Sequence, residues 1–185
     1  MLDILRGFVP WILYFVFSDP DKARLGAGLA LGALVVLNWR GLIGRKILDL
    51  VTLVFFLALV GALSFGNTEL VAKYAFVAAG LVLSLTALGS VALGTPFTLQ
   101  YARESVPEEH QNSPIFWTIN KVISSFWGVI FLLQSVFALL YLDHIGSATL
   151  MNEILPNVLT VVAVIFTTRF PEWYTSRAVK GIHKP

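Results

Sequence analysis

Long apolar stretches, each about as long as a transmembrane helix, are the feature that most constrains this chain. They cover residues 7–17, 23–39, 47–65, 70–93, 118–142 and about 150–168. An α-helix rises about 1.5 Å per residue, so roughly 20 apolar residues cross a hydrocarbon core of about 30 Å. Backbone groups in lipid must bond within their own segment, which favours helices. We therefore predict an all-α, polytopic membrane helix bundle with six transmembrane helices, or five if the first, proline-containing segment is re-entrant.

The composition excludes several classes of protein. Of the 185 residues, 57% are hydrophobic and 13% are charged. A soluble domain of about 150 residues buries only about 70% of its surface, so it could not hide this much apolar area. A soluble enzyme, a disordered tail and a free nucleic-acid-binding domain are therefore excluded. The net charge of +2 is typical of basic loops that face anionic lipid.

The lysines and arginines predict the orientation. One predicted side carries Arg6, Arg40, Arg45, Lys46, Arg103, Lys121, Arg169, Arg177, Lys180 and Lys184, whereas the other carries Lys22, Arg24 and Lys73. Cytoplasmic segments are enriched in these residues. We expect a single transmembrane domain over 1–185 in a bacterial inner membrane, with both termini, a 95–117 loop and a basic 169–185 tail in the cytoplasm.

Polar residues inside the spans are candidates for a site. Asn120, Trp127 and Gln134 recur every seven residues and therefore share one helix face. This face either bonds to a neighbouring helix, which we favour, or lines a ligand cavity. Asp49 follows Arg45 and Lys46 by one helical turn. We expect an ion pair at the membrane interface, with a proton or substrate site as the alternative.

Pairs of small residues four apart allow helices to approach closely. Gly28 with Gly32 and Gly80 with Ser84 form such pairs. We expect them to pack within one bundle, with a homodimer contact as the alternative.

The 95–117 segment is the longest hydrophilic stretch, and we predict that it docks partners. Its candidate docking residues are Phe97, Tyr101, Arg103, Glu104, Glu108 and Glu109. His110 lies beside the acids, but a single imidazole is a weak metal signal, so a solvated charged loop is preferred. No Cys, nucleophile motif or phosphate-binding loop occurs in the sequence. We therefore predict no metal, no cofactor and no catalytic residue, and an enzyme at the membrane surface ranks last.

The layout resembles the intracellular septation protein A family of small bacterial inner-membrane proteins. The resemblance rests on a short N-terminal helix with a proline (LRGFVPWILYFVF) and on a late loop that leads into a helix with Asn and Trp (PFTLQYARESVPEEHQNSPIFWTINKVISSFWGVIFLL). It implies an association with cell-envelope and division machinery, without catalytic residues. The loop here is longer and more acidic than in that family.

Two functions follow from the residues and the resemblance. The first is a non-enzymatic envelope or accessory protein that acts through helix packing and the docking loop. The alternative is a small transporter or lipid-handling protein that uses the Asn120, Trp127 and Gln134 face together with Asp49. The expected partners are the lipid bilayer, other membrane or envelope proteins and further copies of the chain, and no nucleic acid is expected.

Overall fold

A computed structural model describes residues 2–17, 19–140, 142 and 154–182. All regular elements among these residues are helices: α1 (Leu2–Val16), α2 (Ala23–Ile43), α3 (Ile47–Phe65), α4 (Thr68–Ala92), α5 (Phe97–Ala102), η1 (Arg103–Ser105), η2 (Glu108–His110), α6 (Pro114–Leu140) and α7 (Leu155–Ile182). Two predictions fall outside the described residues: the start of the sixth span near Leu150 and the placement of Lys184 in the tail.

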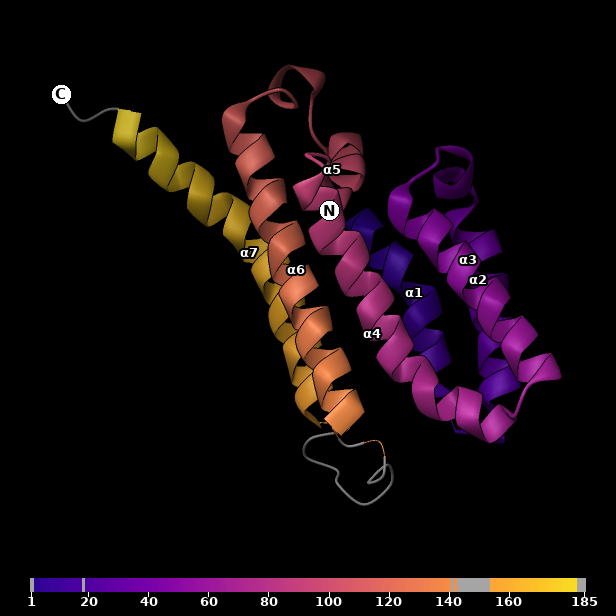
Figure 1. Cartoon of the computed structure of the whole chain (residues 1–185). Helices are drawn as coiled ribbons and strands as arrows, with labels where there is room; N and C mark the ends of the chain where they lie inside the picture. Colours follow the sequence, from indigo (N-terminus) through magenta and orange to yellow (C-terminus); the bar gives the residue numbers. More distant parts are fainter. Residues whose placement is uncertain (1, 18, 141, 143–153, 183–185) are drawn as a thin grey trace.

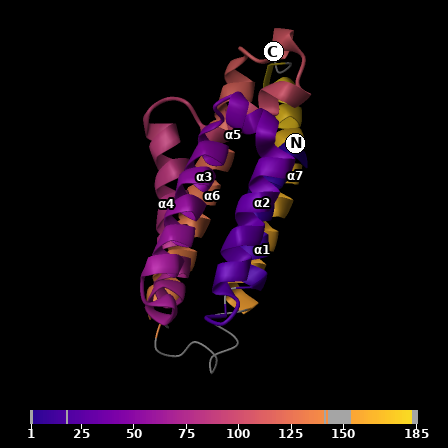
Figure 2. The ribbon, with the colours of Figure 1, turned by 90° about the vertical axis from the view of Figure 1, so that its right-hand side faces the viewer.

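Successive long helices run in opposite directions, so the connections gather at two ends (Figure 1). One end holds the start of α1, the α2–α3 turn, the α5–η2 segment and the end of α7, and we call it the loop end. The view turned by 90° shows the same division (Figure 2). The predicted 95–117 loop therefore contains helical turns and the start of α6, and the chain from residue 169 continues α7 as far as Ile182.

Among the described residues, four helices, α2, α3, α4 and α6, are long and apolar enough to cross a membrane. The prediction of a membrane helix bundle is confirmed in this form. The count of six spans is not, because α1 has only 15 residues and α7 is apolar mainly in its first half. At about 1.5 Å per residue, α1 reaches only about 22 Å, which is short of a hydrocarbon core.

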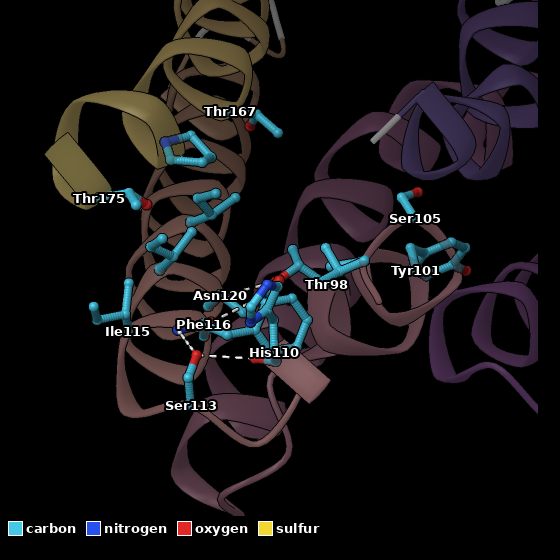
Figure 3. Close-up of a pocket in the computed structure, with 15 residues that line it drawn as sticks. Thr98, Tyr101, Ser105, His110, Ser113, Ile115, Phe116, Asn120, Thr167 and Thr175 are labelled. Atoms are coloured by element: carbon cyan, nitrogen blue, oxygen red, sulfur yellow. Dashed lines mark hydrogen bonds between the residues drawn. The ribbon is translucent and has the colours of Figure 1, made fainter. Parts of the chain in front are cut away.

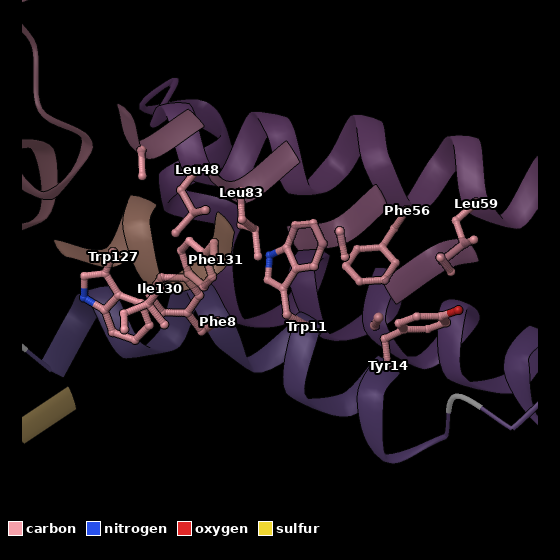
Figure 4. Close-up of a cluster of buried hydrophobic side chains, with 14 of the residues drawn as sticks. Phe8, Trp11, Tyr14, Leu48, Phe56, Leu59, Leu83, Trp127, Ile130 and Phe131 are labelled. Atoms are coloured by element: carbon pink, nitrogen blue, oxygen red, sulfur yellow. The ribbon is translucent and has the colours of Figure 1, made fainter. Parts of the chain in front are cut away.

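The aromatic face of α1 occupies the centre of the bundle (Figure 4). Phe8, Trp11 and Tyr14 recur at helical spacing and are buried, with exposed fractions of 7%, 1% and 0%. Phe8 stacks on Trp127 of α6 at 4.8 Å between ring centroids, and Trp11 lies 5.1 Å from Phe56 of α3. A short helix therefore joins the α2–α3 pair to α6.

Small residues bring α4 and α6 into close contact. A Cβ added at Gly80 would lie 2.7 Å from the Cβ of Ser135, and one at Gly128 would lie 2.5 Å from Leu88 Cγ. Ser84 Oγ donates to the carbonyl oxygen of Gly128 at 2.9 Å. Gly80 and Ser84 therefore lie in a helix contact within the bundle, as side-chain to backbone bonding requires close approach.

Gly28 and Gly32 do not pack in the same way. Both are exposed on α2, and a Cβ at either position would meet nothing within 4 Å. The prediction that this pair packs within the bundle is wrong. The face of α2 that is buried carries Ala23, Ala27 and Ala30 instead, and it lies one position away from the glycine pair in the helical repeat.

Candidate functional site

A cavity of about 580 Å³ lies at the loop end, between the 98–113 segment, α6 and α7 (Figure 3). Its surface is predominantly apolar. The first turns of α6 contribute Ile115, Ile119 and Ile123, whereas Ser105 and His110 belong to the connecting segment. This volume falls within the range of about 300–1,000 Å³ that is usual for small-molecule sites.

The wall formed by α5 is fixed on two sides. Toward α6, Thr98 Oγ1 donates to the carbonyl oxygen of Asn120 at 3.0 Å and lies 2.9 Å from Ser124 Oγ. Toward the α2–α3 turn, the side-chain oxygen of Gln100 accepts a bond of 2.8 Å from the backbone N–H of Ile47. Gly94, at φ 76°, lets the chain turn out of α4 into this segment. These bonds hold the α5 wall in place.

The α7 wall is different because a proline interrupts it. Thr167, Pro171 and Thr175 line the cavity at a spacing of four, so they share one face of α7. Proline lacks the N–H that would bond to Thr167 and crowds that carbonyl, which bends a helix. Figure 1 shows the last part of α7 leaning away from α6. Residues of both helices line the cavity.

A buried polar cluster lies behind the α5 wall. Asp49 of α3 is 1% exposed, and its Oδ1 accepts a bond of 2.7 Å from Nδ2 of Asn38 on α2. The ammonium of Lys46 lies 2.8 Å from a carboxylate oxygen of Glu104. Within the described part of the chain, Asp49 forms no salt bridge with Lys46 or Arg45. The predicted interfacial ion pair is therefore wrong: Asp49 is buried and pairs with an amide.

Tyr101 separates this cluster from the cavity. Its ring lines the cavity, and Figure 3 shows its hydroxyl pointing away from the other lining residues. Burial raises the pKa of Tyr101, and the neighbouring Asp49 carboxylate raises it further. The hydroxyl has no hydrogen-bond partner among the described residues. Lys46 Nζ lies 4.3 Å from the ring centroid. One aromatic side chain thus touches both the apolar cavity and the charged groups.

The three residues of the predicted α6 face, Asn120, Trp127 and Gln134, have different surroundings in the structure. Asn120 lines the cavity, and its Nδ2 donates to the carbonyl oxygen of Phe116 at 2.9 Å. Trp127 Nε1 donates to Thr167 Oγ1 at 2.9 Å. Gln134 Nε2 donates to Thr160 Oγ1 and to the carbonyl oxygen of Pro156, both at 2.9 Å. Trp127 and Gln134 therefore join α6 to α7, and Asn120 alone of the three reaches the cavity.

The candidate docking residues also separate into two groups. Phe97 and Tyr101 are only 1% and 2% exposed, so the prediction that they contact a partner is wrong. Their apolar rings fold under the segment and cover the core. The exposed members are Arg103, Glu104, Glu108 and Glu109. His110 Nε2 lies 3.5 Å from a carboxylate oxygen of Glu109, and the described residues contain no group of three His, Cys, Asp or Glu suited to a metal ion.

Sequence reasoning did not identify Asn38 or Thr167. Asn38 follows the apolar run of α2 directly, and Thr167 is one of several hydroxyl residues in α7, so neither has a distinctive local pattern. Only the three-dimensional contacts show that Asn38 faces Asp49 and that Thr167 faces both Trp127 and the cavity. The chain matches no protein-family model, no curated protein and no solved structure.

Proposed function

We propose that this membrane protein handles lipid, and that it binds one lipid-like amphiphile in the cavity between α5, α6 and α7. The observation that carries the proposal is the form of the cavity. It is large enough for a ligand and mostly apolar, and it lies between helices of the bundle. A hydrocarbon chain gains most from such a surface, because each buried CH₂ contributes about 0.8 kcal/mol.

The cavity lies at the depth where headgroups meet acyl chains. Trp117, near the start of α6, is 38% exposed and has the Lys121 ammonium 5.9 Å from its ring centroid. Tryptophan and lysine with this exposure are typical of a membrane interface. Ile119 and Ile123 lie deeper along α6, whereas His110 and Ser113 lie toward water. We infer that the tail of the ligand contacts the isoleucines and that its polar head faces His110.

Lipid handling is better supported than docking of a partner by the 95–117 segment. The burial of Phe97 and Tyr101 removes the apolar anchors that a docking surface needs. The exposed Glu108 and Glu109 of η2 support docking of a basic partner as a second candidate. Replacing Glu104, Glu108 and Glu109 with Ala and isolating bound partners tests it. If the variant retains the same partners as the natural chain, these glutamates of the 95–117 segment do not dock them.

We propose that the loop end faces the cytoplasm of a bacterial inner membrane. Arg40, Arg45 and Arg103 lie at this end, whereas Lys22 and Arg24 lie at the start of α2 at the opposite end. The positive-inside rule supports this orientation. Envelope association, as in septation protein A-like proteins, remains part of the same proposal. Tags on either terminus that react only after the membrane is permeabilised would agree with it.

Photolabelling of the cavity tests the lipid site. The full chain is reconstituted with a diazirine-containing phosphatidylcholine, illuminated and digested, and the labelled residues are mapped. We expect labels on the cavity side of α6 at Ile119 and Ile123, in addition to its lipid-facing side at Val129 and Leu133. The lipid-facing labels act as an internal reference.

A matched pair of variants makes this test specific. Thr175 lines the cavity mouth and is exposed, and its neighbour Ser176 is exposed on another face of α7. Thr175→Trp should block labelling of Ile119 and Ile123, and Ser176→Trp should not. Absence of cavity labels in the natural chain, or equal labelling in both variants, would overturn the proposal.

A further inference from the structure

One line of exposed side chains runs along α7 from the membrane to the loop end. It consists of residues spaced three or four apart, which share one face of a helix. The line holds Ile154, Val158, Val162, Ile165, Arg169, Trp173 and Arg177. The first four are aliphatic and 44–56% exposed. From Arg169 onward the line carries cations and one tryptophan instead.

This change in character is typical of a helix that passes from acyl chains into the headgroup layer. Aliphatic side chains with this exposure suit contact with acyl chains, and arginine, lysine and tryptophan suit the headgroup layer. Trp173 is 50% exposed, and the guanidinium of Arg177 lies 4.5 Å from its ring centroid. The opposite face of the same segment, with Pro171 and Thr175, lines the cavity. The end of α7 therefore presents two different surfaces.

We propose that the face formed by Arg169, Trp173 and Arg177 binds the phosphate of an anionic phospholipid in the adjacent leaflet. Within the described residues, the salt bridges include neither Arg169 nor Arg177. The exposed Glu172 follows Arg169 by three positions and lies at the edge of this face without forming an ion pair with either arginine. The guanidinium stacked on Trp173 keeps its N–H edge available for phosphate oxygens. The aliphatic line directly below places the headgroup layer at this height.

The bend at Pro171 supports the same occupant. The hydrogen bonds that join α6 to α7 in the described residues, from Gln134 to Thr160 and from Trp127 to Thr167, precede the proline. Beyond it the helix leaves the bundle (Figure 1). A basic, amphipathic helix that leaves a bundle at the membrane boundary is suited to the bilayer surface. This site is independent of the cavity and of the function proposed for it.

The test compares two variants with the same loss of charge. Dioctanoyl phosphatidylglycerol and dioctanoyl phosphatidylcholine are titrated into the detergent-solubilised full chain, and bound lipid is counted by native mass spectrometry. The first variant is Arg169→Gln with Arg177→Gln. The control is Arg40→Gln with Arg103→Gln, two exposed cations at the same end of the bundle.

We expect the natural chain to prefer phosphatidylglycerol, and the α7 variant to lose about fivefold in affinity per charge removed. The control should keep the preference, and Thr175→Trp should keep it as well, which separates this site from the cavity. The proposal is overturned if the control loses as much affinity as the α7 variant. It is also overturned if inorganic phosphate competes as well as the lipid does, because the site would then be one for free phosphate.

Discussion

Helix α6 contacts α4 on one side and α7 on the other, and the two contacts are built differently. Against α4 it packs through Gly80 and Gly128, and Ser84 bonds directly to the backbone of α6. Against α7 it relies on the side chains of Trp127 and Gln134, which reach across to threonine hydroxyls. One side is thus a backbone contact and the other is a set of side-chain bonds.

The difference explains where the cavity lies. Where small residues remove the space between helices, no volume remains for a ligand. Where long side chains hold two helices apart and a proline bends one of them, a space opens at the end of the contact. The structure therefore predicts that changes on the α4 side affect folding, whereas changes on the α7 side affect the cavity.

Gly80→Val should have the largest effect, because its new atoms would overlap Ser135 and the Phe131 carbonyl oxygen, which a Cβ at Gly80 would approach to 3.0 Å. Overpacking of this kind costs about 1–3 kcal/mol, and backbone atoms place this site at the upper end. Unfolding in mixed micelles measures the loss. Gly89→Val on the same helix is the control, since a Cβ there meets nothing within 4 Å. Equal losses in the two variants would show that helix propensity and not packing is responsible.

Gln134→Leu should loosen α7 and leave α4 in place. The variant loses both bonds to α7, and interhelical bonds in membranes contribute about 0.6–1.7 kcal/mol. We expect a loss of about 1 kcal/mol and faster amide exchange in α7 peptides. Ser135→Ala is the control for the contact with α4, because Ser135 Oγ donates to the Val77 carbonyl oxygen of α4 at 2.9 Å. If both variants loosen the same helix, the two contacts of α6 are not independent.

Pro171→Ala should straighten α7 with a smaller change in stability. Alanine restores an N–H to the helix and lowers the cost of a straight segment. Because the chain contains no Cys, spin labels at Asn112→Cys and Ser176→Cys are unique, and both positions are exposed. The distance between the labels should shorten, and labelling of the cavity by the photoreactive lipid should decrease. A distance equal to that of the natural proline-containing chain would mean that another contact sets the bend.

The sequence predicts the helices better than it predicts their partners. Apolar runs of helix length locate α2, α3, α4 and α6, because hydrophobicity in lipid acts over whole segments. Which face of α2 is buried depends on the neighbouring helices. The spacing of Gly28 and Gly32 therefore could not predict whether this pair packs within the bundle. Asp49 reveals the same limit. Its local pattern pointed to Lys46, which lies within one turn, whereas the observed partner Asn38 belongs to another helix.

The candidate site could be predicted only in part. Heptad spacing placed Asn120, Trp127 and Gln134 on one side of α6 from helix geometry alone. That Asn120 faces a cavity while the other two face α7 depends on the bend at Pro171. The 95–117 segment was predicted as a docking loop because the charged residues that follow α5 were visible in the sequence. The burial of Phe97 and Tyr101 could not be seen from the sequence, because it depends on how the segment packs on the core.

Tyr101→Phe should have the smallest effect at neutral pH and a clear effect in alkali. The hydroxyl is buried without a partner among the described residues, so its removal at pH 7 should change the free energy of unfolding by less than about 1 kcal/mol. The folded-state pKa of Tyr101 is raised above its ordinary value of about 10, so the unfolded chain loses this proton first as the pH rises. The stability that Tyr101 provides is therefore complete below about pH 10 and falls by about 1.4 kcal/mol per pH unit above it.

Unfolding at pH 8 and pH 11 should show a smaller alkaline loss of stability for Tyr101→Phe than for the natural chain. Tyr74→Phe is the control for loss of a phenol, because the Tyr74 ring is 45% exposed. A loss well above 1 kcal/mol at pH 7 would instead show that the hydroxyl bonds to Asp49, and the α5 wall of the cavity would then be held by the polar cluster as well as by Thr98 and Gln100.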